Sequence, residues 1–171
     1  MNSKNLIDEL NRIFKDKSDF DKFFEVVLGE IPEYIRLNPL KIEKEKLLKN
    51  LREKGFILKE NEFFPEAIEV IDKKFEISKT IEHFLGYFYI QSLSSMIPVK
   101  LLEIKEDDKV LDICAAPGSK TTQAGIYLKN KGIIFSNDIN IERLRALSHN
   151  VDRIGLLNCS INRIDGEKIG D

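Results

Sequence analysis

The chain has few cysteines, no apolar stretch long enough to cross a membrane and no excess of basic residues. Cys114 and Cys159 are its only cysteines; they lie far apart and lack metal-ligand spacing, so we expect neither disulfide bonds nor a zinc site. A spanning helix needs about 20 apolar residues, and the amino terminus opens directly into an amphipathic pattern. These features predict a cytoplasmic protein that binds no metal and no membrane.

The charge balance limits what can be said about nucleic acids. The chain of 171 residues has 27 Lys and Arg against 29 Asp and Glu, so no global positive field marks it as a nucleic-acid binder. In the lysine-rich stretch 41–59, glutamates alternate with the lysines, which is typical of a solvated helix face. Any contact with RNA must therefore be local.

The most informative segment is 110–123, which predicts a strand, a tight turn and a helix. Residues 109–113 are apolar enough for a strand buried on both faces, as in a parallel sheet covered by helices. The small residues 115–118 allow a sharp turn and a close approach of a ligand to the backbone. A helix beginning at Ser119 would direct its free amide hydrogens at that ligand.

Two common nucleotide-binding loops do not fit this segment. A phosphate-binding loop requires glycine where Ile113 stands, and here Ser119 separates Gly118 from Lys120. A dinucleotide-binding turn requires three glycines, and only one lies between Leu111 and Ala124. Both an ATPase and a dinucleotide-dependent enzyme are therefore disfavoured.

The turn Asp-Ile-Cys-Ala-Ala-Pro-Gly-Ser-Lys-Thr, residues 112–121, resembles that of the S-adenosylmethionine-dependent RNA (cytosine-5) methyltransferases of the nucleolar-protein and Sun type, the RsmB/NOP family. Further segments are similar to this family in the same order: 36–41 (Arg-Leu-Asn-Pro-Leu-Lys), 84–98 with its Gln-x-x-Ser-Ser-Met core, 132–140 and 143–155. The resemblance covers residues 33 to 167, and within the family the chain is most similar to the compact archaeal tRNA enzymes.

Periodicity and resemblance together predict three regions. Residues 1–30 should form two amphipathic helices that pack on each other through Leu6, Leu10, Phe14 and the phenylalanines near residue 20. Residues 31–80 should form a small α+β accessory lobe, which the resemblance identifies as RNA-binding. Residues 81–171 should form a partial Rossmann-like methyltransferase domain. The fold class is thus α/β, the first half of such a sheet.

The elements expected in the accessory lobe are strands at 34–37, 56–59 and 67–70, a helix at 43–54, and a turn or short helix at 78–85. A further helix should end near Leu102, with Ser95 as its N-cap and with Met96, Val99 and Leu102 on one face. In the methyltransferase region we expect strands at 109–114, 132–137 and 157–162 and helices at 119–129 and 140–153. Right-handed crossovers predict parallel strands in the order third, second, first.

The resemblance implies S-adenosylmethionine as cofactor and a set of residues around it. The backbone from Cys114 to Ser119 would hold its methionine part, and Lys120 would lie near the cofactor and the target base. The implied cofactor-binding residues are Cys114, Ala115, Ala116, Pro117, Gly118, Ser119, Lys120, Asp138, Arg143 and Asp165.

Three of these residues have structural alternatives. Asp138 follows Gly118 by twenty positions, where an acidic side chain can bind ribose hydroxyls, and its structural alternative is the N-cap of the next helix. Asp165 would receive the adenine amino group or simply occupy a turn. Arg143 would contact the cofactor edge or pair with Asp138 or Glu142.

The chemistry requires a nucleophile that the chain does not supply. Carbon 5 of cytosine becomes nucleophilic only after a cysteine thiolate adds to carbon 6. The family places its two working cysteines in Asp-Ala-Pro-Cys-Ser-Gly and Thr-Cys-Ser turns, and neither occurs here. Cys114, at the end of a buried strand, and Cys159, in mid-strand, are expected to pack.

We therefore predict a family that forms 5-methylcytosine in tRNA or rRNA, with no DNA partner. This chain would contain no catalytic residue, would be inactive alone and would lack a carboxyl-terminal half. The alternatives are a methyltransferase of another acceptor and a noncatalytic module that binds the cofactor or RNA.

Overall fold

The computed structural model describes residues 9–10, 12–14, 16–29 and 31–170, and the chain divides into two compact units, Met1–Ile31 and Pro32–Asp171. In the first unit, helix α2 (Lys17–Leu28) begins after Asp16, whose carboxylate accepts a hydrogen bond from the Ser18 amide at 2.8 Å. The Phe14 ring packs on that of Phe23, 5.1 Å between centroids. Contact between the two predicted helical segments is thus confirmed at Phe14, whereas Leu6 lies outside the described residues.

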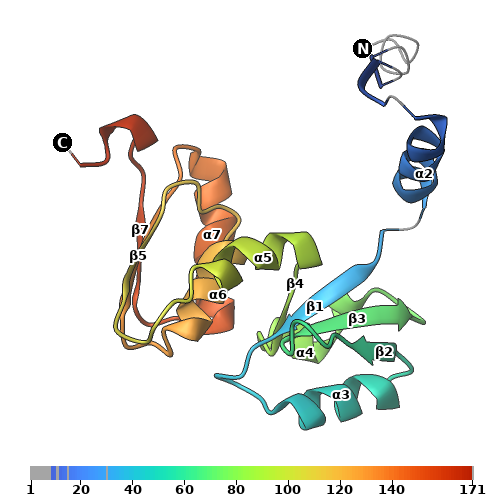
Figure 1. The fold of residues 1–171 in the computed structure, drawn as a ribbon. Helices are drawn as coiled ribbons and strands as arrows, with labels where there is room; N and C mark the ends of the chain where they lie inside the picture. Colours follow the sequence, from blue (N-terminus) through green and yellow to red (C-terminus); the bar gives the residue numbers. More distant parts are fainter. Residues whose placement is uncertain (1–8, 11, 15, 30, 171) are drawn as a thin grey trace. The chain divides into compact units, whose positions relative to one another are not determined.

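The second unit begins with a four-stranded antiparallel sheet (Figure 1). Its strands, in spatial order, are β2 (Ile57–Glu60), β3 (Ala67–Asp72), β1 (Glu33–Leu37) and β4 (Phe88–Ile90). Helix α3 (Lys44–Glu53) buries Leu47, Leu48 and Leu51 against it, in a core shared with Ile35 and Ile68. The short helices η1 (Ile77–Lys79) and α4 (Ile81–Phe84) complete this region. The predicted strands and helices of 31–80 are confirmed.

Between residues 86 and 102 the structure has one strand that the sequence does not predict, and it contradicts the predictions for Ser95 and Leu102. Strand β4 was not predicted, because three residues are too few to show a period; it pairs with β1, Phe88 lying opposite Leu37. Helix α5 (Leu93–Leu101) follows Ser92 and not Ser95, since pairing continues up to the Gln91 amide. The helix ends one residue before Leu102, which is 64% exposed.

The rest of the unit is a three-stranded parallel sheet, order β5-β6-β7, with two helices along one face (Figure 1). The elements are β5 (Lys109–Asp112), α6 (Ser119–Tyr127), β6 (Ile133–Asn137), α7 (Ile141–Ile154) and β7 (Cys159–Asn162). This confirms the predicted strand order and the alternation of strands and helices expected of a Rossmann-like sheet.

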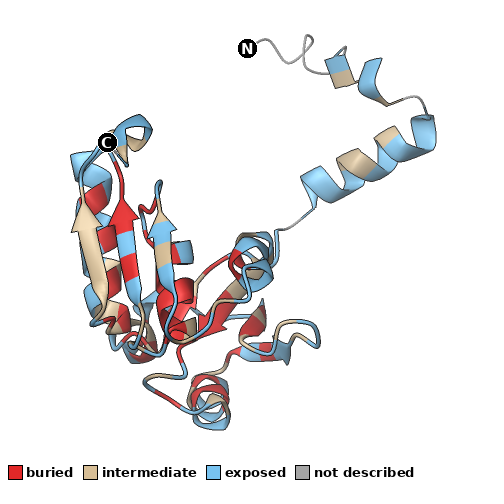
Figure 2. Ribbon diagram, turned by 60° about the vertical axis from the view of Figure 1, so that its left-hand side comes forward, coloured by how far each residue is buried: buried red, intermediate tan, exposed pale blue. Residues whose placement is uncertain are grey.

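Only one face of the parallel sheet is covered. Burial alternates along β6, where Ile134 is fully buried and Phe135, on the other face, is 45% exposed (Figure 2). Leu111 of β5 lies beside Phe135 and is 51% exposed. The prediction that β5 is buried on both faces is therefore wrong, because within residues 31–170 the covering helices pack on one face of the sheet only.

Neither a membrane-spanning helix nor a metal cluster occurs in the described part of the chain. Its longest helix, α7, has 14 residues, and none is both long and apolar enough to cross a bilayer. In the same ranges, no three His, Cys, Asp or Glu side chains gather as metal ligands would.

Candidate cofactor site

The turn between β5 and α6 lies at the carboxyl ends of the parallel strands. The Ala115 amide donates to the Asn137 carbonyl at 2.8 Å, which ties the turn to the end of β6. Ala115, Ala116 and Gly118 are buried, whereas Cys114, Pro117 and Lys120 are exposed. Ligands of open α/β sheets bind at this edge, where helix amides and strand ends meet.

Three carbonyl groups of the turn accept hydrogen bonds from side chains of other elements. Arg143 Nη2 donates to the Ala116 carbonyl, and Asn150 Nδ2 donates to that of Pro117 at 2.9 Å. Arg36 Nη1, from strand β1, donates to the Ser119 carbonyl at 2.7 Å. The turn is thus fixed from its carbonyl side by α7 and by β1.

The amide side of the turn offers donors to a ligand. Gly118 is the N-cap of α6 and has no side chain to accept hydrogen bonds from the first-turn amides. Gly118 also has φ +106°, and a Cβ there would lie 2.9 Å from Leu147 Cδ1 of α7. Glycine therefore both permits the left-handed turn and brings the turn close to α7.

Asp138 lies beside the turn and is 3% exposed. Its Oδ1 accepts from the Asn140 amide at 3.0 Å, and its Oδ2 accepts from the Ala116 amide at 3.3 Å. Arg143 Nη1 pairs with Oδ2 at 3.1 Å. Of the predicted alternatives for Arg143, the structure shows the pair with Asp138. The N-cap of α7 is Asn140, so the structure does not show the alternative in which Asp138 caps this helix.

Asp165 follows β7, and Lys120 lies in the first turn of α6. Asp165 caps the short helix η2 (Gly166–Lys168) and accepts from the Glu167 amide at 3.2 Å, which is the turn role predicted as its alternative. Lys120 is exposed in the first turn of α6. Its charge opposes the helix dipole, so the helix gains nothing from a lysine at this position.

The two cysteines differ from their predicted places. Cys114 is exposed, because β5 ends at Asp112 and Cys114 already lies in the turn. Cys159 opens β7 instead of lying in its middle; it is half-buried, with its Sγ 3.2 Å from Ser136 Oγ. Burial raises the pKa of the Cys159 thiol, which disfavours the reactive thiolate.

Sequence reasoning did not single out three polar residues that hold the turn. Asp112 accepts a hydrogen bond from the Thr121 hydroxyl at 2.7 Å and so joins the end of β5 to α6. Arg36 and Asn150 bind the turn's carbonyls from distant parts of the chain. All three lie within the segments that carry the family resemblance, which was the only signal available for them.

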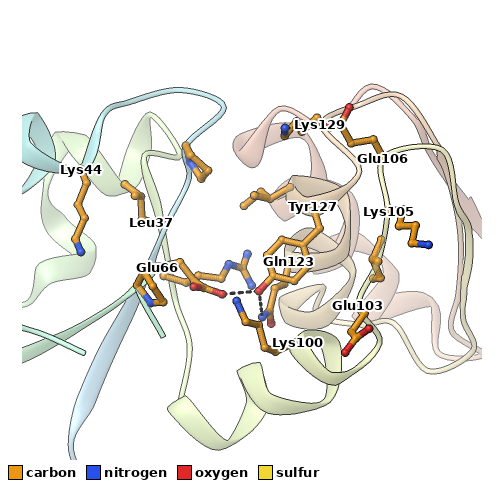
Figure 3. Close-up of a pocket in the computed structure, with 15 residues that line it drawn as sticks. Leu37, Lys44, Glu66, Lys100, Glu103, Lys105, Glu106, Gln123, Tyr127 and Lys129 are labelled. Carbon is orange, nitrogen blue, oxygen red and sulfur yellow. Dashed lines mark hydrogen bonds and ion pairs between the residues drawn. The ribbon is translucent and has the colours of Figure 1, made fainter. Parts of the chain in front are cut away.

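A cavity of about 710 Å³ lies at the far end of α6, between the antiparallel sheet and the loop before β5 (Figure 3). Gln123 and Tyr127 of α6 face Glu66 there, and the Tyr127 hydroxyl donates to the Glu66 carboxylate. Burial and this hydrogen bond raise the pKa of Tyr127 to about 12. The cofactor turn lies at the opposite end of α6, and Arg36, which lines the cavity, also binds the Ser119 carbonyl of that turn.

Comparison with known proteins shows which family the chain resembles. Residues 99–171 match the family model described as 16S rRNA methyltransferase RsmB/F. Through this segment the chain is similar to the RsmB/F methyltransferases. The match begins in α5 and includes the whole parallel sheet with its turn, and it confirms the family predicted from the motifs. The family is of the S-adenosylmethionine-dependent type.

Similarity extends to the antiparallel sheet. Ribosomal RNA small subunit methyltransferase F of Vibrio parahaemolyticus is 33% identical, over 96% of this chain and 35% of the relative. The 26S rRNA (cytosine-C(5))-methyltransferase nsun-1 of Caenorhabditis elegans is 33% identical, over 91% of this chain and 24% of the relative. A methyltransferase homologue from Pyrococcus horikoshii has a crystal structure with TM-score 0.81 and 32% identity, over 97% of this chain and 58% of that one. The chain thus spans about a quarter to a third of these two curated relatives.

Proposed function

We propose that the chain binds S-adenosylmethionine at the turn 114–120 and forms the cofactor-binding part of an RNA (cytosine-5) methyltransferase. The observation that carries this proposal is the arrangement of the turn: its carbonyls are bound by the protein, the amides of α6 lack a side-chain cap, and the carboxylate of Asp138 lies beside it.

The donors and acceptors of the site match the groups of that cofactor. The first-turn amides of α6 suit the carboxylate of its amino-acid end. Asp138 uses three of about four acceptor positions on its carboxylate and so retains capacity for a ribose hydroxyl. Asp165, at the end of β7, would receive the adenine amino group. The bound cofactor supplies an electrophilic methyl group, and this chain's residues hold and orient it.

We infer an RNA acceptor, rRNA or tRNA, from the relatives, which are named as rRNA cytosine methyltransferases. The exposed Lys120, at the start of α6, would lie towards the target base. Neither cysteine is suited to be the nucleophile, because the pKa of Cys159 is raised and Cys114 lies in the cofactor turn itself. We therefore expect residues 1–171 alone to transfer no methyl group.

The uncovered face of the parallel sheet supports a further part of the enzyme. Leu111, Ile133 and Phe135 lie on that face, and β5 is an edge strand. Contiguous apolar surface next to an open strand edge is typical of a surface that other polypeptide covers. The greater length of the two curated relatives is consistent with such a part, and it would supply the nucleophile.

Calorimetric titration of residues 1–171 with S-adenosylmethionine tests the cofactor assignment. Asp138→Asn should weaken binding about tenfold, equivalent to about 1.4 kcal/mol, because a neutral amide is a poorer acceptor for ribose hydroxyls. Asp152→Asn is the matched control, since it makes the same charge change on an exposed residue of α7 and should bind within twofold of the parent chain. Equal affinities of all three proteins would reject Asp138 as a ribose ligand.

A further inference from the structure

The segment Arg36-Leu-Asn-Pro-Leu-Lys41 joins the antiparallel sheet to the parallel sheet and its helices. Asn38 is fully buried, and its Nδ2 donates to the carbonyls of Gly86 and Ile154, both at 2.8 Å. Lys41 Nζ donates to the Leu85 carbonyl at 3.0 Å and to the Arg153 carbonyl at 2.7 Å. Both residues thus bind the carboxyl-terminal end of α7 from outside it.

Arg36 lies two residues before Asn38 but reaches a different place. It donates to Gln91 Oε1, to the Ser119 carbonyl at 2.7 Å and, through Nη2, to Thr122 Oγ1 at 2.8 Å. Its guanidinium also lies over the Tyr89 ring, 5.3 Å from the centroid. Arg36 therefore holds the first turn of α6, the helix that begins at the cofactor turn.

The backbone before β4 lies in close contact with the carboxyl-terminal end of α7. Gly86, beside Asn38, has φ +71°, and a Cβ there would lie 1.8 Å from the Arg153 carbonyl oxygen. Backbone packed this tightly cannot slide without breaking the hydrogen bonds of Asn38. The segment that follows strand β1 is therefore held at the carboxyl-terminal end of α7.

Arg36 is a buried charge held by hydrogen bonds. It is 1% exposed and forms no salt bridge within residues 31–170, although Glu66 favours its charged form; its Nε has no hydrogen-bond partner. Burial lowers the pKa of Arg36 to about 10, so it carries its charge at neutral pH without an ion pair. Its hydrogen bonds to Gln91, Ser119 and Thr122 offset the cost of burying the charge, and two of these three partners belong to the first turn of α6.

We propose that the polar residues of this segment form an interlobe clamp, defined as Arg36, Asn38 and Lys41, and that Arg36 is a positioning residue for cofactor binding. This rests on the proposed function of the turn. Arg36 fixes the Ser119 carbonyl and the Thr122 hydroxyl, and so keeps the amides of the first turn directed at the cofactor. Asn38 and Lys41 fix the same lobe to α7 without touching the turn.

A chain of hydrogen bonds leads from Arg36 along α6, beside the cavity shown in Figure 3. Gln91, which accepts from Arg36, donates through Nε2 to Gln123 Oε1 at 3.2 Å. Gln123 Nε2 in turn donates to the Tyr127 hydroxyl at 3.2 Å, and Tyr127 donates to Glu66. Both ends of α6 are therefore held by the antiparallel sheet, and its first turn is held through Arg36.

The test compares Arg36→Met, Arg36→Lys and Asn38→Ala in residues 1–171. S-Adenosylmethionine affinity is measured by calorimetry, thermal stability by circular dichroism, and exchange of the amides of 114–122 by hydrogen–deuterium exchange without ligand. We expect Arg36→Met to bind at least tenfold more weakly and to exchange faster at these amides. Arg36→Lys, which keeps the charge and some donors, should recover part of the affinity.

Asn38→Ala is the control for general loosening, because it removes two buried interlobe hydrogen bonds of the same segment. It should lower the melting temperature yet bind the cofactor within twofold of the parent chain. If Asn38→Ala weakens binding as much as Arg36→Met, or if a folded Arg36→Met binds normally, the positioning role is rejected.

Two further results keep the test decisive. If Arg36→Met does not fold, Thr122→Val removes one acceptor of Arg36, together with the bond from that hydroxyl to the Ser119 carbonyl, and should still weaken binding about threefold; unchanged affinity would overturn the proposal. If the parent chain binds no cofactor, the proposed function fails, and the exchange rates of 114–122 in Arg36→Lys and Asn38→Ala still decide whether Arg36 orders the turn.

Discussion

The central strands of the two sheets differ in how they are covered. In β1, consecutive side chains are both buried: Ile35 faces the core under α3, and Arg36 faces α6. In β6, Ile134 is buried and its neighbour Phe135 is not. The antiparallel sheet thus lies between two layers of the described structure, whereas the parallel sheet has one. An apolar strand sequence predicts that both faces of the strand are buried. It does not predict whether the same chain or another polypeptide packs on each face.

The largest expected effect follows directly from this difference. Ile134→Ala should lower the free energy of unfolding by about 3 kcal/mol, because it leaves a cavity in the closed core. Ile133→Ala makes the same change one residue earlier on the open face and should cost about 1 kcal/mol or less. Urea unfolding of residues 1–171 measures both.

Equal losses from the two variants would mean that the open face is covered even in residues 1–171. Repeating the unfolding at several protein concentrations separates the causes, since cover by a second copy depends on concentration. In the complete enzyme that we propose, the cost of Ile133→Ala should rise towards that of Ile134→Ala.

Much of the fold could be predicted because its signals are local. The helices 44–53, 119–127 and 141–154 have helical periodicity and recognisable ends, and the βαβ alternation fixed the strand order. Strand β4 could not be predicted, since its three residues form a strand only by pairing with β1. The start of α5 was misjudged because Ser92, Ser94 and Ser95 offer competing N-caps within one turn.

A smaller effect is expected from the turn that joins the parallel sheet to α6. Gly118→Ala should lower the free energy of unfolding by about 2 kcal/mol, because φ +106° is strained for alanine and its Cβ would press on Leu147. Gly170→Ala is a matched control: Gly170 has φ +116°, and no atom lies within 4 Å of the added Cβ. Gly170→Ala should lower the free energy of unfolding by about half as much as Gly118→Ala or less. Thermal unfolding of both variants measures the difference.

If Gly170→Ala lowers the free energy of unfolding as much as Gly118→Ala does, then backbone strain, and not the contact with α7, makes glycine necessary at residue 118. Cofactor titration sharpens the distinction. Gly118→Ala should also weaken binding, since it displaces the amides of the turn, while Gly170→Ala should leave binding unchanged.

The candidate site was predictable only where it is contiguous in the sequence. The turn 114–120 and Asp138 follow from a motif and a spacing, and the structure brings them together. Arg36 and Asn150 touch the same turn from 83 and 33 residues away along the chain. Such contacts depend on how the two sheets pack, so periodicity and local spacing contain no signal for them.

The smallest expected effect concerns the end of the parallel sheet at which its strands begin. Glu106, in the loop before β5, pairs with Lys129 at 2.5 Å and with Lys131. Hydrogen bonds from these two lysines lower the pKa of Glu106 to about 2. Because the folded pKa lies below the unfolded one, this stabilisation is complete above about pH 4.5 and is lost as the pH falls towards 2. The carboxyl chemical shift of Glu106 measures the pKa.

Glu106→Gln should therefore lower stability slightly at pH 7 and not at all near pH 2, and added salt should reduce the difference, because these side chains are exposed. Glu103→Gln is the control, since Glu103 lies in the same loop and has no ion pair in residues 31–170. A Glu106 carboxyl that titrates near 4.5 would show that the lysines do not hold it. The ion pairs of Glu106 would then add nothing to the stability of this end of the sheet, which would depend on backbone contacts such as that of the Ile133 amide with the Asp108 carbonyl at 3.1 Å.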